Sequence, residues 1–262
     1  AYLKAGILGF AGSGKTFTAS EIAIGLAKDI GGNKPVAFFD TETGSDFMIP
    51  RFRKAGIELL VAKTRSFADL LTFMKEAQES GCSVVVIDSI THVWMELQAA
   101  YKKRKKVSEL SFQDWGPLKD EWRQFTDSYV NVPMHAILCG RAAFEYDFEV
   151  NDRGKKELVK TGTKMRAENE MGYEPSLLLE MERVPKADRV DERDTKGAGW
   201  THRCYVLKDR TDTMNGRVFD DPKYSHFELV VKFLNIGAPH VGVDTSRNSE
   251  KLFDGPDRSA HE

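Results

Sequence analysis

The feature that most constrains the fold is a glycine-rich run, G-F-A-G-S-G-K-T, over residues 9–16. It satisfies the pattern G-x-x-x-x-G-K-[ST] at every fixed position, and it lies between an apolar run at residues 3–8 and a segment with helical spacing at residues 17–28. Glycines let successive backbone N–H groups point at phosphate oxygens, and the following helix adds its positive N-terminal dipole. The run therefore predicts a nucleotide-binding loop. A glycine-rich turn with a chance lysine and threonine is the alternative.

The loop and the residue after it are the expected nucleotide contacts: Gly9, Phe10, Ala11, Gly12, Ser13, Gly14, Lys15, Thr16 and Phe17. Lys15 is expected to reach the β- and γ-phosphates of ATP and to act in catalysis, and the Thr16 hydroxyl to hold Mg²⁺. Asp88 ends an apolar run at residues 84–87 and is the second expected magnesium ligand. The alternative for Asp88 is an aspartate that caps the next helix.

Apolar runs alternate with helical segments along the first half of the chain. The runs are residues 3–8, 36–39, 59–62, 84–87 and 135–139, and the helical segments are residues 17–28, 67–79 and 94–129. Strands separated by helices in this order predict βαβ units. The expected fold class is therefore α/β, with a mainly parallel sheet flanked by helices.

The second half of the chain has a different pattern. Residues 144–150 alternate apolar and acidic side chains, and the turn residues 151–154 lead to another alternating stretch, which predicts a protruding β-hairpin. Later strands are expected at residues 176–181 and 203–207, on either side of a charged loop at residues 185–199. A helix is expected at residues 227–234. We expect one domain over residues 1–236, with insertions at about 94–130 and 144–164, and a polar, flexible tail over residues 237–262.

Bulk composition excludes several classes of protein. No apolar run approaches the roughly 20 residues of a membrane span, so no membrane partner is expected. Three widely spaced cysteines form no C-x-x-C pair, which favours a reducing setting such as the cytosol. Residues 1–8 are too short for a signal peptide and are expected to form a core strand. The formal net charge of -2 means that any case for nucleic acid is local.

Four elements in order resemble the RecA family of P-loop ATPases. They are G-F-A-G-S-G-K-T, A-F-F-D-T-E ending at Glu42, L-L-V-A at residues 59–62 and V-V-V-I-D-S-I at residues 84–90. The resemblance covers about residues 1–236 and is closest to phage-encoded RecA-like ATPases of single-strand annealing and recombination. It implies a cytoplasmic location, in the cytosol of a phage or bacterial host. It implies that the Glu42 carboxylate polarises the water that attacks the γ-phosphate. Ser89 cannot act as a carboxylate base, which leaves this role to Glu42. A solvated carboxylate is the alternative, and Asp40 is a candidate for a supporting position behind the site.

Three basic residues are further catalytic candidates. Arg141 stands where RecA proteins carry a polar sensor, and it either senses phosphate or pairs with a carboxylate. Lys208-Asp209-Arg210 is similar to the K-x-R element through which RecA-like and DnaB-like ATPases reach a neighbour's nucleotide. This similarity implies that Lys208 and Arg210 act in trans and that the chain self-associates into a ring or filament. A solvated edge strand is the alternative.

Residues 94–122 and 142–164 correspond to the DNA-binding loops of RecA-like proteins. The first segment carries Lys102, Lys103, Arg104, Lys105 and Lys106 with Tyr101, Phe112 and Trp115, and the second carries Phe144, Tyr146, Arg153, Lys155, Lys156, Lys160 and Lys164. Cations neutralise phosphates and aromatic rings stack on bases, so single-stranded DNA is the expected partner. A single-strand-binding protein is a further candidate partner. For any single residue, a solvated helix face or a place in the core is the alternative.

The function expected from these patterns is that of a RecA-like ATPase. It binds and hydrolyses Mg-ATP, binds single-stranded DNA and promotes annealing or recombination. Two alternatives stay open: a DnaB-like helicase, motor or loader component, and a nucleotide-dependent small-molecule kinase or switch.

Overall fold

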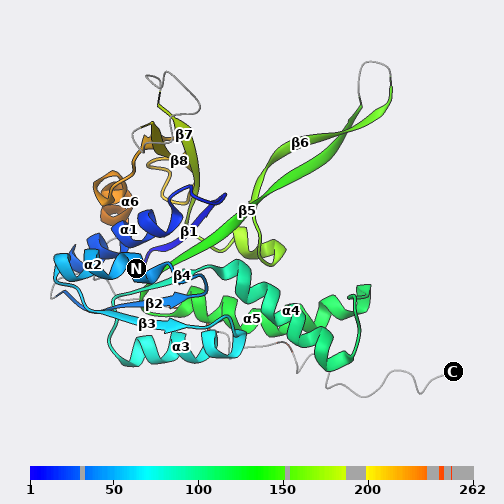
Figure 1. Cartoon of the computed structure of the whole chain (residues 1–262), viewed down its shortest axis with the longest axis horizontal. Helices are drawn as coiled ribbons and strands as arrows, with labels where there is room; N and C mark the ends of the chain where they lie inside the picture. Colours follow the sequence, from blue (N-terminus) through cyan, green and yellow to red (C-terminus); the bar gives the residue numbers. More distant parts are fainter. Residues whose placement is uncertain (30–32, 151–153, 187–198, 235–241, 245–248, 250–262) are drawn as a thin grey trace.

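A mainly parallel sheet forms the centre of the molecule (Figure 1). The computed structural model describes residues 1–29, 33–150, 154–186, 199–234, 242–244 and 249. The strands are β1 (Lys4–Gly9), β2 (Val36–Asp40), β3 (Leu59–Lys63), β4 (Val84–Asp88), β5 (His135–Val150), β6 (Lys156–Met165), β7 (Leu177–Pro185), β8 (Trp200–Asp209) and β9 (Val218–Asp220). Their order is β3-β2-β4-β5-β1-β7-β8-β9, with β6 paired to β5 alone. Pairing is parallel from β3 to β7 and antiparallel beyond, so the fold is the α/β arrangement predicted above, a mainly parallel sheet with later antiparallel strands.

The central strands are buried on both faces. Every residue of β1, β2 and β4 is buried, which explains why these strands are continuous apolar runs rather than alternating ones. Because side chains of one strand point to both faces, the sheet requires a helical layer on each side. The predicted strands of the first half are therefore confirmed.

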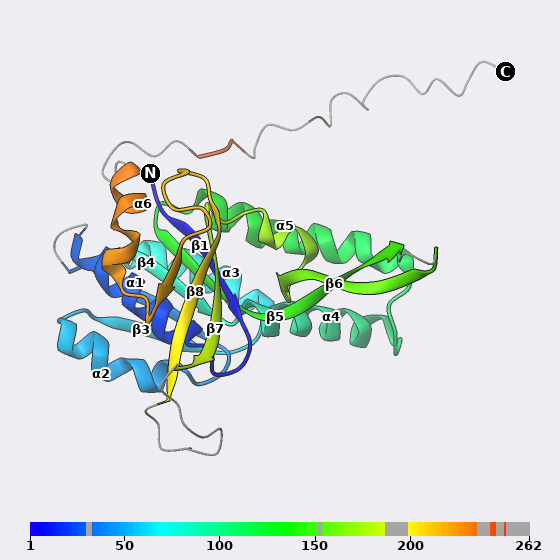
Figure 2. The same cartoon turned by 90° about the horizontal axis from the view of Figure 1, so that it is seen from above.

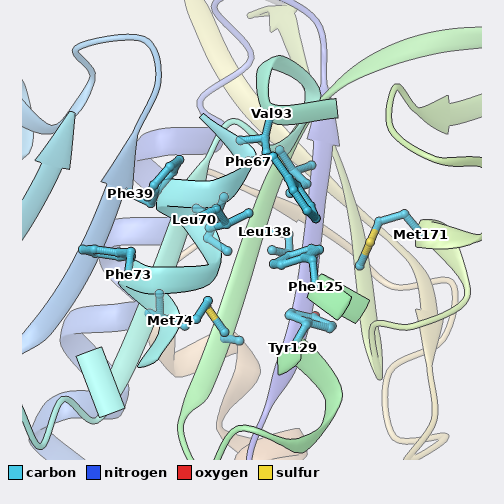
Figure 3. Packing of buried hydrophobic residues seen from close by; sticks show 14 of the residues in the cluster. Phe39, Phe67, Leu70, Phe73, Met74, Val93, Phe125, Tyr129, Leu138 and Met171 are labelled. Atoms are coloured by element: carbon cyan, nitrogen blue, oxygen red, sulfur yellow. The ribbon is translucent and has the colours of Figure 1, made fainter. Parts of the chain in front are cut away.

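Helices cover both faces of the sheet (Figures 1 and 2). They are α1 (Lys15–Asp29), α2 (Ser45–Ala55), α3 (Phe67–Glu79), α4 (Ile90–Lys105), α5 (Trp115–Asn131) and α6 (Glu228–Phe233), with short turns η1 (Phe112–Asp114), η2 (Asn169–Gly172) and η3 (Tyr224–Phe227). One core lies under α1, α2 and α6. The other lies under α3, α4 and α5, where Phe39, Leu70 and Phe125 interleave (Figure 3). This two-sided packing leaves one edge of the sheet, where the parallel strands end, free for loops.

Three elements differ from the sequence-based expectation. The helical stretch at residues 94–129 is two helices, because Lys106 adopts a left-handed conformation with φ 57° and ends α4. Helix α2 was not predicted, since it buries only Ser45 and Phe52 and contains Pro50, so its apolar periodicity is weak. The short edge strand β9 was also missed. The predicted loop at residues 185–199 and tail at residues 237–262 lie largely outside the described residues.

Strand β5 is one continuous strand of 16 residues, not a core strand followed by a separate hairpin. Up to Arg141 it pairs in parallel with β1, and from Ala142 it pairs in antiparallel with β6. The backbone groups of its second half find partners in β6, so the strand continues beyond the body of the sheet. Most of the hairpin turn predicted at residues 151–154 lies outside the described residues.

Gly25 in α1 allows a test of the packing between α1 and the turn η3. A Cβ at Gly25 would lie 2.0 Å from Cγ of the Tyr224 ring. Gly25→Ala should therefore cost about 1–3 kcal/mol of stability and lower the melting temperature, although alanine is the better helix former. Gly116→Ala in α5 is the matched control, because nothing lies within 4 Å of a Cβ at that position, and it should leave stability unchanged or raise it. Thermal unfolding followed by circular dichroism distinguishes them, and equal effects would contradict this packing.

Candidate nucleotide-binding site

The predicted site residues lie at the edge of the sheet where the parallel strands end. Strand register places Asp40 beside Asp88, and Gly9 beside Arg141. Loops that follow neighbouring parallel strands meet at such an edge, which is where α/β sheets bind their ligands. Residues from four strands that are far apart in sequence therefore converge on one position.

The phosphate loop runs from the end of β1 into the first turn of α1. Gly12 and Gly14 have φ values of 73° and 93°, which favour glycine, and a Cβ at Gly9 would lie 2.5 Å from the Met181 carbonyl oxygen. Nζ of Lys15 donates to the carbonyl oxygen of Phe10 at 2.9 Å, so the ammonium group lies on the loop itself. The glycines of the motif are thus required by backbone conformation and by close packing against β7.

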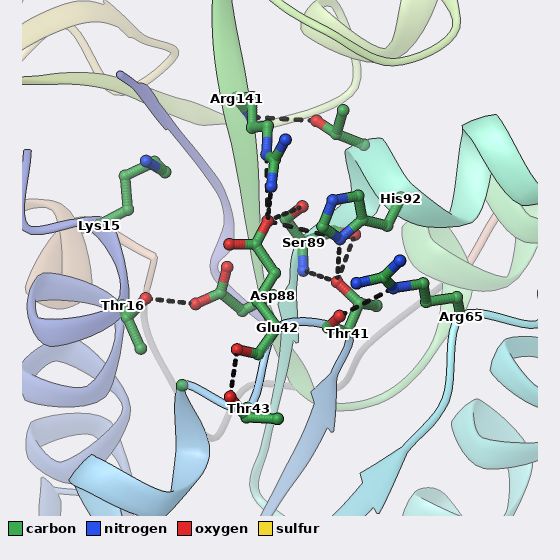
Figure 4. A network of polar contacts seen from close by, with 12 residues as sticks. Lys15, Thr16, Thr41, Glu42, Thr43, Arg65, Asp88, Ser89, His92 and Arg141 are labelled. Carbon is green, nitrogen blue, oxygen red and sulfur yellow. Dashed lines mark hydrogen bonds and ion pairs between the residues drawn. The ribbon is translucent and has the colours of Figure 1, made fainter. Parts of the chain in front are cut away.

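Thr16 and Asp88 meet at the start of α1. The Thr16 hydroxyl donates to Oδ2 of Asp88 at 2.5 Å (Figure 4). Burial, together with the negative charge of Glu42, raises the pKa of Asp88 to about 6 against the effect of this hydrogen bond. A buried carboxylate with a raised pKa beside a hydroxyl is a position that a hard divalent cation would complete. The two residues therefore fit a magnesium site, and the bound ion would neutralise charge on the phosphates.

Asp40 has a structural task in the loop after β2. Its Oδ1 accepts from the backbone N–H of Glu42 at 2.9 Å and of Gly44 at 3.2 Å, and its Oδ2 accepts from the backbone N–H of Ser45 at 2.9 Å. Burial alone would raise the pKa of Asp40, but these bonds and that of the Ser45 hydroxyl lower it overall. Asp40 thus has the supporting role considered above. Its carboxylate binds three backbone N–H groups and so orients the loop that carries Glu42.

Glu42 is held by a cluster of donors from the N-terminal end of α4 and from β5. Its Oε1 accepts from Nε and Nη2 of Arg141 at 3.1 and 3.0 Å, and from the Ser89 hydroxyl at 3.2 Å (Figure 4). Nδ1 of His92 lies 3.4 Å from the same oxygen. The Glu42 side chain is 37% exposed, so water reaches it. Of the two readings of Arg141, the structure shows the pairing with a carboxylate, and that carboxylate is the predicted water-activating group.

Three polar residues that the sequence analysis missed support this cluster. The Thr41 hydroxyl accepts from the Ser89 backbone N–H at 2.8 Å and lies 2.9 Å from Nδ1 of His92. Nε of Arg65 donates to the Thr41 carbonyl oxygen at 3.0 Å. Burial lowers the pKa of His92, as do the charges of Arg141 and Arg65, while Glu42 opposes them. The only sequence signal was the spacing of His92 from Ser89, which puts both on one side of the first turn of α4.

A pocket of about 420 Å³ adjoins the phosphate loop on the side of α1 and α2. The ring of Phe17 forms one wall, and the guanidinium carbon of Arg51 lies 4.0 Å from its centroid. Oδ1 of Asp221 accepts from the His202 backbone N–H at 3.0 Å and closes the opposite side. The volume of this pocket suits a small organic group next to bound phosphates. Phe17 was expected at the nucleotide, whereas no sequence pattern indicated Arg51, His202 or Asp221.

Lys208 and Arg210 lie away from the phosphate loop of their own chain. Lys208 pairs with Leu178 of β7, whereas Gly9 pairs with Met181, three residues further along that strand and so roughly 10 Å away. Lys208 and Arg210 both donate to the Tyr173 carbonyl oxygen, at 2.6 and 2.8 Å. They face the opposite end of the sheet, so contact with a nucleotide requires a second chain.

The hairpin of β5 and β6 has two chemically different faces. Side chains alternate across each strand, so Phe144, Tyr146 and Phe148 share one face with Lys156 and Lys160. The other face carries the acidic residues: Glu145, Asp147, Glu149 and Glu157. We call the face with Phe144, Tyr146 and Phe148 the aromatic face. On it, Tyr146 is 55% and Phe148 is 65% exposed to solvent.

The root of the hairpin contacts the phosphate loop. The ring of Phe144 lies 4.9 Å from that of Phe10, and Nζ of Lys160 lies 3.8 Å above the Phe144 ring. The aromatic face of the hairpin therefore begins at the nucleotide site and extends outward from it.

The segment at residues 94–122 is less exposed than predicted. Tyr101 is buried, and it and Lys105 both contact the carboxylate of Asp114. Trp115 packs near Trp94, with ring centroids 6.5 Å apart, and only Phe112 is almost fully exposed, at 93%. For Tyr101 the expectation of a nucleic-acid contact is wrong, because the ring belongs to the core.

Comparison with known proteins identifies the family of this chain. The family model described as "AAA domain" matches residues 1–211. No curated protein matches the chain. A KaiC-like protein from the hyperthermophilic archaeon Pyrococcus horikoshii is similar in structure, with a TM-score of 0.49 and 15% sequence identity over 83% of this chain and 84% of that one. Among the helices described, none is both long and apolar enough to cross a membrane.

The pKa of Asp88 leads to a prediction about proton release. At pH 6 its carboxyl is about half protonated, and magnesium binds only the carboxylate form. Binding of a magnesium complex of a non-hydrolysable ATP analogue at pH 6 should release about half a proton more from the wild type than from Asp88→Asn. Affinity should fall as the pH drops below 6. Calorimetry in buffers of different ionisation enthalpy measures the release, and equal values for both proteins would contradict the assignment.

Proposed function

We propose that this chain, which belongs to the AAA domain family, is an ATPase that hydrolyses Mg-ATP, binds single-stranded DNA and promotes annealing or recombination. The observation that carries the ATPase proposal is the convergence of the phosphate loop, Asp88 and Glu42 at one edge of the sheet. Each of the three tasks of phosphoryl transfer to water has a residue there: phosphate binding, charge neutralisation and orientation of the water.

Glu42 and Arg141 divide the catalytic work. Glu42 accepts the proton of a water aligned with the γ-phosphate, and Ser89 and His92 keep its carboxylate in place. Arg141 holds Oε1 of Glu42 through two donors, and its guanidinium has further N–H groups that can bind a phosphate oxygen. A phosphate that draws Arg141 away from Glu42 frees the carboxylate for the water. Hydrolysis then follows the arrival of the nucleotide.

Single-stranded DNA suits the aromatic face of the hairpin. Exposed rings at Tyr146 and Phe148 offer stacking surfaces, and Lys156 and Lys160 stand beside them for phosphates. The acidic face repels a polyanion, so a strand is directed to one side. Contact between Phe144 and Phe10 connects this face with the phosphate loop. This arrangement supports an ATPase whose rate responds to DNA.

Self-association belongs to the same proposal. Lys208 and Arg210 point away from the nucleotide site of their own chain and toward solvent at the opposite end of the sheet. In a head-to-tail ring or filament this end faces the nucleotide of the next chain, where two cations stabilise charge on the transferred phosphoryl group. The Tyr173 carbonyl oxygen holds both side chains in the single chain.

The role of Glu42 is tested by substitution. Glu42→Gln should lower kcat by a factor of about 10² or more, because general base catalysis is lost, while binding of a labelled ATP analogue persists. Lys15→Ala should lose both hydrolysis and tight binding. Glu76→Gln, an exposed glutamate on α3, is the matched control and should hydrolyse ATP like the wild type. Normal hydrolysis by Glu42→Gln would show that the water is activated elsewhere.

The DNA part of the proposal is tested on the hairpin. An oligothymidylate should raise the ATPase rate of the wild type, and Tyr146→Ser with Phe148→Ser should weaken its binding about tenfold or more, since a base stacked on a ring contributes about 1–3 kcal/mol. Val159→Ser removes an apolar side chain from the acidic face and should bind DNA normally. Fluorescence anisotropy gives the affinities. No stimulation of the wild type, with a phosphorylated small-molecule product, would instead favour a kinase.

A further inference from the structure

A groove of about 300 Å³ lies between α4 and α5. The two helices run side by side away from the sheet, and the chain turns back between them at residues 106–114, so the end of α4 and the start of α5 form one tip (Figures 1 and 2). Most of the residues that line the groove are apolar: Leu97, Ala100, Tyr101, Pro117 and Leu118. Tyr101 and Leu118 are buried, whereas Ala100 and Pro117 are exposed. The groove therefore offers an apolar surface to a short segment with large apolar side chains.

The two charged residues that line the groove have opposite signs and lie at different levels along it. Arg104 is in the last turn of α4, at the tip, and its guanidinium carbon lies 5.5 Å from the centroid of the Tyr101 ring. Glu121 follows Pro117 by about one turn of α5, so it lies further from the tip, and it accepts from the Gln124 amide at 2.8 Å. Among the residues that the structure describes, neither Arg104 nor Glu121 forms an ion pair within this groove or with another helix. An occupant of matching charge would place an anion at the tip and a cation further from it.

A later part of the chain is held at the other end of α5. The Val243 backbone N–H donates to Oδ1 of Asn131, the last residue of α5, at 2.7 Å. A Cβ at Gly242 would lie 2.9 Å from the same oxygen, so the chain passes Asn131 closely. Asn131 follows Pro117 by close to four helical turns, and the two residues therefore lie on the same side of α5, about 21 Å apart. Residues beyond Val243 thus start on the side of the helix where the groove opens.

Residues 250–257 lie outside the described residues, and their sequence is E-K-L-F-D-G-P-D. Leu252 and Phe253 are the two large apolar residues that follow Val243 in the sequence. Leu252 is nine residues after Val243, and a chain of this length spans up to about 30 Å. This reach exceeds the separation of about 21 Å along α5 from the held end of the chain to the groove. This apolar pair can therefore reach the groove of its own chain.

The charges of the segment follow the same order as those of the groove. Lys251 precedes the apolar pair and Asp254 follows it. A segment that leaves the end of α5 and runs toward the tip passes Glu121 first and Arg104 last. Lys251 would thus lie at the acidic residue and Asp254 at the basic one, where opposite charges attract. Reach, apolar content and charge order all indicate the same occupant.

We propose that residues 251–254 bind the groove between α4 and α5 of their own chain. Leu252 and Phe253 fill its apolar part, with the lysine before them at Glu121 and the aspartate after them at Arg104. The hydrogen bond at the end of α5 keeps the segment near the groove, and the resulting high effective concentration lets a contact of a few residues form. The chain thereby covers part of its own helical pair. The contact requires neither nucleotide nor DNA.

Disulfide formation in the full chain tests this contact. Ala100→Cys with Gly255→Cys places one thiol in the groove and the other just after the segment, and the two should form an intramolecular disulfide. Ala99→Cys with Gly255→Cys is the matched control, because Ala99 is also exposed but lines a different pocket. The control should react about tenfold more slowly, since its thiol meets the segment only by chance. The native cysteines are buried and do not compete.

Substitutions in the segment and in the groove show what holds the two together. Phe253→Ser should lower the rate of the Ala100→Cys pair to that of the control. Phe233→Ser, which removes a ring that is 63% exposed on α6, should leave the rate unchanged. Arg104→Glu should slow the reaction about twofold, and the added change Asp254→Arg should restore it, because exchange of the two charges keeps their attraction. Thermal unfolding shows whether each variant is folded.

Three outcomes would overturn the proposal. Equal disulfide rates for the Ala99→Cys and Ala100→Cys pairs would show that the segment does not bind the groove. Disulfides that join two chains only would assign the segment to the groove of a second copy. A rate that Phe253→Ser leaves unchanged would show that the apolar pair does not hold the segment. These reactions contain neither ATP nor DNA, so failure of the proposed ATPase function leaves their outcome unaffected.

Discussion

The in-register parallel pairing of the central strands is the constraint on which the site depends. Because β2, β4, β5 and β1 end at the same edge, Asp40, Asp88, Arg141 and Gly9 come together although they are far apart in sequence. A shift of β4 by one residue relative to β2 would turn Asp88 to the opposite face. The continuous burial of both strands opposes such a shift, since a charged side chain would then enter a helix-covered core.

Two aspartates at neighbouring strand ends have opposite electrostatic situations. Asp40 is stabilised as an anion by backbone N–H groups and a hydroxyl, and its pKa is lowered. Burial and two acidic neighbours raise the pKa of Asp88 to about 6, although the Thr16 hydroxyl and the charge of Lys15 stabilise its anion. The Asp40 carboxylate is stabilised by hydrogen bonds within the protein, and it fixes the conformation of a loop. The Asp88 carboxylate is stabilised only in part, as is expected of a ligand that binds a cation.

The sequence predicted what depends on local pattern. Continuous apolar runs identified the buried strands, and the spacing of Gly9, Gly14 and Lys15 identified the phosphate loop, because each signal lies within about ten residues. The pairing of Arg141 with Glu42 joins residues 99 positions apart, and no local pattern contains it. His92 and Arg65 were missed for the same reason. Helix α2 was missed because contacts with α1 compensate for the weak apolar periodicity and for Pro50.

The unbroken course of β5 also determines how the hairpin can change in length. Because side chains alternate, loss of two residues from β5 and two from β6 shortens the ribbon and keeps the aromatic and acidic faces where they are. Loss of a single residue between Arg141 and Tyr146 would exchange the faces for the whole outer part, while Arg141 stayed in place. A natural register irregularity already lies between Glu145 and Tyr146, where one extra residue of β6 is accommodated. Insertions and deletions in this arm therefore keep its two faces when an even number of residues changes, or when a bulge absorbs the odd residue.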